Sequence, residues 1–197
     1  MQFKIFEPGV EVNAPTISSI IAGLGYFTNL SRRFFSEAGI GTVINKELHI
    51  DMDGWYPQTA WLLAFENIAK TVGDRVLFNI GLSIPENAQF PPWVVDVDSG
   101  IKAIDIAYHL NHRKNGIPMF NPETGTMTEG IGHYGYDRAA GENRIISISH
   151  NPYPCAFDHG IITAMAQKFA PNALVNHDNT KECRKNGAET CTYTITW

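Results

Sequence analysis

Three cysteines and one histidine near the end of the chain have the residue types and spacing that most clearly suggest chemistry. Cys155, His177, Cys183 and Cys191 follow the pattern Cys-x21-His-x5-Cys-x7-Cys. Three thiolates and one imidazole make a complete tetrahedral shell for a structural zinc ion. Two alternatives fit the same residues: buried thiols with no shared role, because cysteine is often buried, and a disulfide between Cys183 and Cys191.

The elements around these residues are expected to bring them together. The turn Asn151-Pro-Tyr-Pro154 precedes a run with apolar residues at helical spacing, so Cys155 should lie in the first turn of a helix. The partial positive charge at a helix N-terminus lowers the pKa of a thiol, which favours the metal-binding thiolate.

A hairpin is predicted to supply the other three donors. Residues 173–177 are typical of a short strand, and residues 191–197 alternate strictly between threonine and larger side chains. A turn at Asn186-Gly187 can join the two strands. His177 would then lie near Cys191, with Cys183 on the connecting loop.

The same segment resembles a known family. The run NPYPCAFDHGIITAMAQKF, followed by HDNTKECRKNGAETCTYTITW, resembles the end of the 4-vinyl reductase-like domain, within the superfamily of heme-NO-binding-like folds. Cys155, Gly160, Cys183 and Cys191 match position by position. In the phenol-sensing members of this family, three cysteines and one glutamate hold a zinc ion, so the resemblance implies zinc here. No glutamate stands at the fitting distance, and His177 or Asp178 is the available substitute. His159 is a rival ligand.

A second group of polar residues lies on a predicted helix at about 98–113. Asp105, His109 and His112 share one face at offsets of four and seven residues, and His133 follows on a predicted strand. These histidines have three interpretations. They are hydrogen-bonded helix histidines, or they line a ligand pocket without metal, or they form a second metal site or catalytic centre with His109, His112 and His133 as the candidates.

An apolar pocket is expected beside this helix. The segment GWYPQTAWLLAFENIAKTVG predicts a helix with an apolar stripe, and it resembles the Trp-led helix that walls the ligand pocket in the family. The predicted ligand contacts from both regions are these: Trp55, Trp61, Phe65, Tyr108, His109 and Tyr134.

Composition and element order predict one folded α+β domain spanning residues 1–197, with an antiparallel sheet covered on one face by several helices. Hydrophobic residues make up 44% of the 197 residues, enough for a sizeable core. The helical part should extend over about 1–113, including one long helix from residue 17 to about 38. A loop at 114–130, a candidate lid, should lead to a sheet-rich part at about 131–197.

Several classes of protein are disfavoured by composition. The net charge is −5 and basic residues occur only in pairs, which argues against nucleic-acid binding. No apolar run reaches about 18 residues, which argues against a membrane span. The N-terminus has no signal-peptide pattern, which favours the cytoplasm. Phe34 and Phe35 cannot both face one core from a helix, which suggests a second buried surface and therefore a homodimer.

These patterns together predict a cytoplasmic protein that binds or senses a small hydrophobic or aromatic ligand and carries a structural zinc ion. The first alternative is an enzyme that uses the histidines or a metal on a small hydrophobic substrate. A nicotinamide site is not expected, because no Gly-x-Gly-x-x-Gly follows a strand. The second alternative is a heme protein, since seven histidines are available as ligands.

Overall fold

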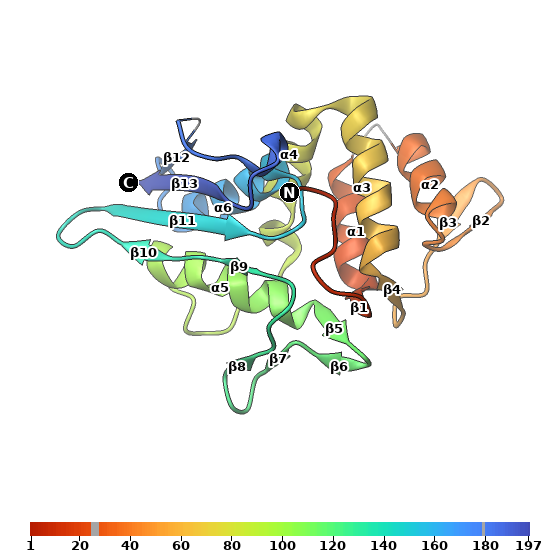
Figure 1. Ribbon diagram of the computed structural model, residues 1–197, viewed down its shortest axis with the longest axis horizontal. Helices are drawn as coiled ribbons and strands as arrows, with labels where there is room; N and C mark the ends of the chain where they lie inside the picture. Colours follow the sequence, from red (N-terminus) through yellow and green to blue (C-terminus); the bar gives the residue numbers. More distant parts are fainter. Residues whose placement is uncertain (25–27, 179) are drawn as a thin grey trace.

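A five-stranded antiparallel sheet organises the C-terminal half of the protein (Figure 1). The computed structural model describes residues 1–24, 28–178 and 180–197. The strand order is β10-β11-β13-β12, with β9 also pairing with β11. The strands are β9 (His133–Tyr134), β10 (Asp137–Arg138), β11 (Arg144–His150), β12 (Leu174–His177) and β13 (Cys191–Thr196). Helices and antiparallel strands thus form an α+β fold in a single domain, and this prediction is confirmed.

Two helices pack against the sheet: α5 (Val97–Leu110) contacts β9, and α6 (Cys155–Phe169) contacts β12 and β13. A third helix, α4 (Asp74–Ser83), packs on α6, which also contacts α5. The crossing of α4 and α6 is very close, because glycines face each other there. A Cβ atom added to Gly160 would lie 2.1 Å from the carbonyl oxygen of Phe78 and 2.9 Å from the Cα of Gly81. The two backbones are therefore in direct contact.

The N-terminal half builds a second sheet and the remaining helices, which Figure 1 shows on the opposite side of the molecule from β12 and β13. The second sheet has the order β4-β1-β5-β6. Its strands are β1 (Val10–Asn13), β4 (Trp55–Pro57), β5 (His112–Lys114) and β6 (Ile117–Pro118). The helices here are α1 (Ala14–Gly23), α2 (Thr28–Glu37) and α3 (Gln58–Val72). Two small hairpins complete this half: β2 (Thr42–Ile44) with β3 (Glu47–His49), and β7 (Phe120–Asn121) with β8 (Thr126–Met127). The described residues also include the 3₁₀ turns η2 (Pro85–Asn87) and η3 (Arg184–Asn186).

Several boundaries differ from the sequence predictions. The single helix expected from residue 17 to about 38 is two helices, and its predicted middle at residues 25–27 lies outside the described residues. The helix expected at 98–113 begins at Val97, directly after its capping residue Asp96, and ends at Leu110. His112 therefore lies beyond the helix, on β5. The expected loop at 114–130 contains short strands, because its turns allow local pairing.

The core is continuous between the two halves, and it includes both Phe34 and Phe35, which are 3% and 0% exposed. Both rings are buried within one chain, so the observation that suggested a homodimer has an explanation inside the protomer. Homodimerisation stays a prediction. Among the described residues, no helix combines the length and apolarity needed to cross a lipid bilayer.

Candidate functional site

An apolar cavity of about 100 Å³ lies between the N-terminal helices and the sheet-bearing half. Helices α1, α3, α5 and α6 contribute to its wall, together with the segment that follows α4. The lining side chains are mostly aromatic or aliphatic: Trp61, Ile84, Phe90, Ala103, Ile104, Tyr108, Tyr134, Tyr153, Phe157, Ile161 and Met165 are among them. Such a wall excludes water and favours an apolar occupant.

His112 and Tyr153 form a polar corner in this wall. His112 Nδ1 lies 2.6 Å from the carbonyl oxygen of Tyr108, so the ring proton must be on Nδ1. Its Nε2, 2.7 Å from the Tyr153 hydroxyl, then accepts a hydrogen bond from that hydroxyl. Gln58 donates to the same hydroxyl oxygen over 3.5 Å. Burial lowers the pKa of His112 to about 4 and raises the pKa of Tyr153. The corner is therefore uncharged near neutral pH.

Half of the predicted ligand contacts line this cavity. Trp61, Tyr108 and Tyr134 are in its wall. Phe65 packs behind the wall against Trp61 and Phe157, with ring centroids 5.2 and 5.0 Å away.

The other two predicted contacts lie elsewhere. Trp55 is on β4, where the guanidinium of Arg113 stacks over its ring. His109 lies on α5 but faces His133, with ring centroids 4.8 Å apart. Their placement gives them no direct contact with an occupant of the cavity.

The structure brings the four predicted metal donors together. One ligating atom each from Cys155, His177, Cys183 and Cys191 lies within 4.8 Å of the other three. Cys155 begins α6, as predicted, and β12 pairs with β13 so that His177 stands opposite Tyr193. The Cys183 sulfur lies 3.8 Å from that of Cys155 and 3.7 Å from that of Cys191. All three cysteines are free thiols, so the disulfide alternative is not observed.

The rival ligands are occupied by other partners. His159 places its Nε2 2.9 Å from the carbonyl oxygen of Val175, and Asp178 accepts from Thr180. His177 has a buried Nε2 with no hydrogen-bond partner. Among the candidates weighed from the sequence, His177 is therefore the one whose nitrogen joins the three sulfurs.

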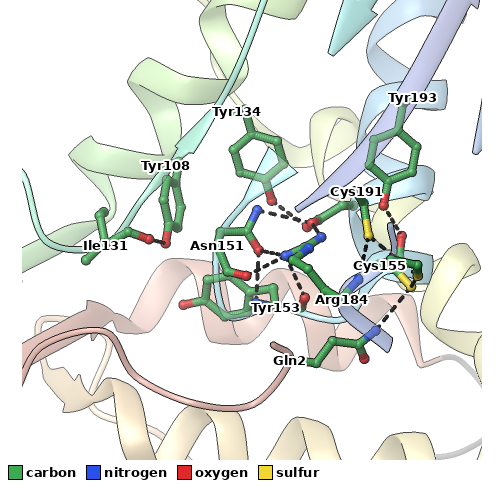
Figure 2. Close-up of polar contacts among 12 residues, drawn as sticks. Gln2, Tyr108, Ile131, Tyr134, Asn151, Tyr153, Cys155, Arg184, Cys191 and Tyr193 are labelled. Atoms are coloured by element: carbon green, nitrogen blue, oxygen red, sulfur yellow. Dashed lines mark hydrogen bonds and ion pairs between the residues drawn. The ribbon is translucent and has the colours of Figure 1, made fainter. Parts of the chain in front are cut away.

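The pKa values of Cys155 and Cys191 are shifted in opposite directions. A hydrogen bond between Cys155 and Cys191 lowers the pKa of Cys191 and raises that of Cys155, and burial adds to the rise at Cys155. The prediction that the helix N-terminus lowers the pKa of Cys155 is wrong, because the neighbouring thiols and burial outweigh the helix dipole. Gln2 also donates to the Cys155 sulfur over 3.1 Å, and Tyr193 donates to the Cys155 carbonyl (Figure 2).

A buried polar network beside the cluster was not anticipated from the sequence. Arg184 and Asp158 form an ion pair whose side chains are both 0% exposed. Figure 2 shows Tyr134, Asn151 and Arg184 converging there. Asp158 accepts from the Tyr134 hydroxyl at 2.6 Å, and Arg184 donates to Asn151 and to the Tyr153 carbonyl. The available signal was Asp158 itself, a charge within a run of buried apolar residues on α6.

The third group is Asp105, His109 and His133, where one ligating atom of each residue lies within 4.8 Å of the other two. Asp105 Oδ2 is 2.9 Å from His133 Nδ1, and His133 Nε2 is 3.1 Å from Glu129. Burial opposes the charge on His133, but the two carboxylates outweigh it and raise its pKa. His112, expected beside these residues, points instead to the cavity.

Several solved structures of H-NOX proteins match the fold of this chain over most of its length. An H-NOX protein from S. oneidensis in the Fe(II)NO ligation state matches 93% of this chain and 97% of its own, with 14% identity and a TM-score of 0.62. Unliganded Fe(II) H-NOX from K. algicida matches 94% and 95%, with 12% identity and a TM-score of 0.57. A structure from a study of heme distortion in the H-NOX family matches 92% and 93%, with 12% identity and a TM-score of 0.61.

No family model and no curated protein sequence matches the chain. The structural likeness therefore shows the fold that H-NOX proteins share, in agreement with the heme-NO-binding-like part of the sequence resemblance. The narrower resemblance to the 4-vinyl reductase-like domain is not supported. The descriptions of these neighbours name heme or an iron ligation state and do not name zinc, so the expectation of zinc as the cofactor is wrong.

The residues present do not fit a heme in this arrangement. The cavity of about 100 Å³ is well below the several hundred Å³ of typical cofactor pockets. His112 is the histidine in its wall, and both of its nitrogens already make hydrogen bonds. A porphyrin would therefore have to open the helices and displace Tyr153 from His112.

Proposed function

We propose that this protein is a small-molecule-sensing domain that binds a mostly apolar molecule, about the size of a single aromatic ring, in the cavity between α3, α5 and α6. The observation that carries this proposal is the aromatic cavity of about 100 Å³ with a polar corner at His112 and Tyr153. An engineered protein cavity of about 150 Å³ accepts benzene, so the present one suits a molecule built on one small ring.

The polar corner supports a preference for a ligand with one hydroxyl group. Tyr153 donates its proton to His112, and its oxygen accepts from Gln58 only over a long 3.5 Å, a weak bond that a ligand hydroxyl can replace. A phenol-like hydroxyl can donate to that oxygen while its ring contacts Trp61 and Phe157. One such hydrogen bond contributes about 1 kcal/mol.

Calorimetric titration with benzene and with phenol tests the proposal. We expect both to bind, phenol more tightly, and Ala103→Leu to abolish binding because Ala103 lines the cavity and the larger side chain fills it. Ala140→Leu is the matched control, since Ala140 is exposed in the loop between β10 and β11. Unchanged binding by the Ala103→Leu protein, or no binding of either probe to the unsubstituted protein, would overturn the proposal.

Heme is the second candidate, and the H-NOX neighbours favour it. Added hemin should give no Soret band if the cavity keeps its present size. A stoichiometric Soret band that is lost in His112→Gln would replace the small-ligand proposal with heme binding at the same cavity.

A further inference from the structure

The group formed by Asp105, His109 and His133 joins two elements that lie next to each other. Asp105 and His109 are one turn apart on α5, and His133 is on β9, which packs against α5. Two imidazoles and one carboxylate are the donor set of facial-triad sites for Fe(II) and similar cations. This group lies outside the apolar cavity and shares no residue with the cysteine cluster.

A hydrogen bond within α5 fixes the orientation and the protonated nitrogen of the His109 ring. Its Nδ1 lies 2.9 Å from the carbonyl oxygen of Asp105, which places the ring proton on Nδ1. Its Nε2 therefore carries a lone pair, and this nitrogen is buried without any hydrogen-bond partner. A ring N–H donated to a backbone carbonyl is the usual arrangement behind a metal-bound histidine. Leaving such a nitrogen unpaired is otherwise unfavourable.

Contacts from β9 hold the Asp105 carboxylate in place. Its Oδ1 accepts the backbone N–H of Tyr134 at 2.8 Å, and its Oδ2 lies 2.9 Å from His133 Nδ1. Donors bound to one ion at roughly 2.1 Å are about 3 Å apart at right angles. One ligating atom of each of the three residues lies within 4.8 Å of the other two, so the side chains must move closer together to bind an ion.

Solvent reaches the group through His133. Its side chain is 36% exposed, against 16% for Asp105 and 0% for His109. Glu129, with a side chain that is 80% exposed, lies 3.1 Å from His133 Nε2 and adds negative charge at the entrance. A cation would therefore approach past Glu129, and the proton that it displaces from His133 would leave to solvent.

We propose that Asp105, His109 and His133 form a binding site for a first-row divalent cation that prefers nitrogen and oxygen ligands, such as Fe²⁺ or Co²⁺. The site has three protein ligands and leaves open positions for water or a small ligand. It does not depend on the occupant of the apolar cavity.

Titration with Co²⁺ alone tests the site, because its absorption spectrum reports the donor atoms. We expect one Co²⁺ per chain with a nitrogen- and oxygen-type spectrum, weakened about tenfold or more in His133→Gln and in Asp105→Asn. His49→Gln, at an exposed histidine on β3, should leave the affinity unchanged. Far-ultraviolet circular dichroism identifies any variant that fails to fold, and the partly exposed His133 is the safer substitution.

Two results would overturn the proposal. The first is a spectrum with only the sulfur-to-cobalt charge-transfer bands expected from the cysteine cluster. The second is equal Co²⁺ affinity in the folded His133→Gln and the unsubstituted protein, which would leave the group as a charged His133 held between Asp105 and Glu129.

Discussion

His112 gives this protein a pH-dependent stability that a single residue explains. Burial lowers its pKa from an ordinary 6.5 to about 4 in the folded state. In the pH range between these values the unfolded chain binds a proton at His112 and the folded chain does not. The stability contributed by the neutral ring is therefore complete above the ordinary pKa and is lost as the pH falls toward the folded pKa.

We expect the free energy of unfolding to fall by about 2 kcal/mol from His112 alone between about pH 7 and pH 5. Urea unfolding of the protein and of His112→Gln at both pH values measures this difference. The variant should be less stable near neutrality, since it loses a buried ring, yet its stability should depend less on pH by that amount. Parallel pH profiles for the two proteins would show that His112 is not the responsible group.

Residue-scale predictions from the sequence succeeded where local spacing determines position. The alternation of residues 191–197 and the Asn186-Gly187 turn were enough to place His177 near Cys191. The partners of buried charges could not be found in this way. Asp158 and Arg184 are 26 residues apart, and their pairing depends on how the C-terminal hairpin docks against α6. The expectation for His112 failed because α5 stops at Leu110, before it.

At the scale of elements, glycine decides how closely two helices approach. The sequence showed Gly160 only as a residue shared with a resembling family, and its physical role appears when α4 crosses α6. Its hydrogen faces the backbone of Phe78 and Gly81, which cannot move away as a flexible side chain can. The local sequence showed where Gly and Pro end helices and form turns. It did not show this contact between α4 and α6.

We expect Gly160→Ala to destabilise the protein by about 3 kcal/mol, because the added methyl group must separate the two helices. Gly100→Ala is the matched control on α5. A Cβ atom there meets the ring of Phe169 at 2.9 Å, a side chain that can shift, and the better helix propensity of alanine offsets part of the strain. Denaturant midpoints for both variants measure the difference. Equal midpoints would contradict a backbone contact at Gly160.

At the scale of the whole molecule, Arg184 attaches the C-terminal hairpin to the rest of the fold. It follows Cys183, its backbone N–H points to the Cys191 sulfur at 3.3 Å, and its side chain reaches Asp158 on α6 and Asn151 after β11. Burial lowers the pKa of Arg184, but the neighbouring Asp158 carboxylate outweighs this and keeps the pKa above its ordinary value. The guanidinium is thus a charged link between segments that the sequence places far apart.

Removing one partner of this pair should cost far more than removing a surface pair. We expect Arg184→Met to destabilise the protein by about 3–5 kcal/mol, because Asp158 is left buried without the guanidinium that compensates for its loss of water. Lys185→Met, which removes only the exposed ion pair with Asp74, should cost less than about 1 kcal/mol. The double variant Asp158→Asn/Arg184→Met should be more stable than Arg184→Met alone, since it removes the unpaired charge. Thermal and urea unfolding of the four proteins measure these differences. If the double variant were the less stable, the shape of Arg184 rather than its charge would hold the hairpin to α6.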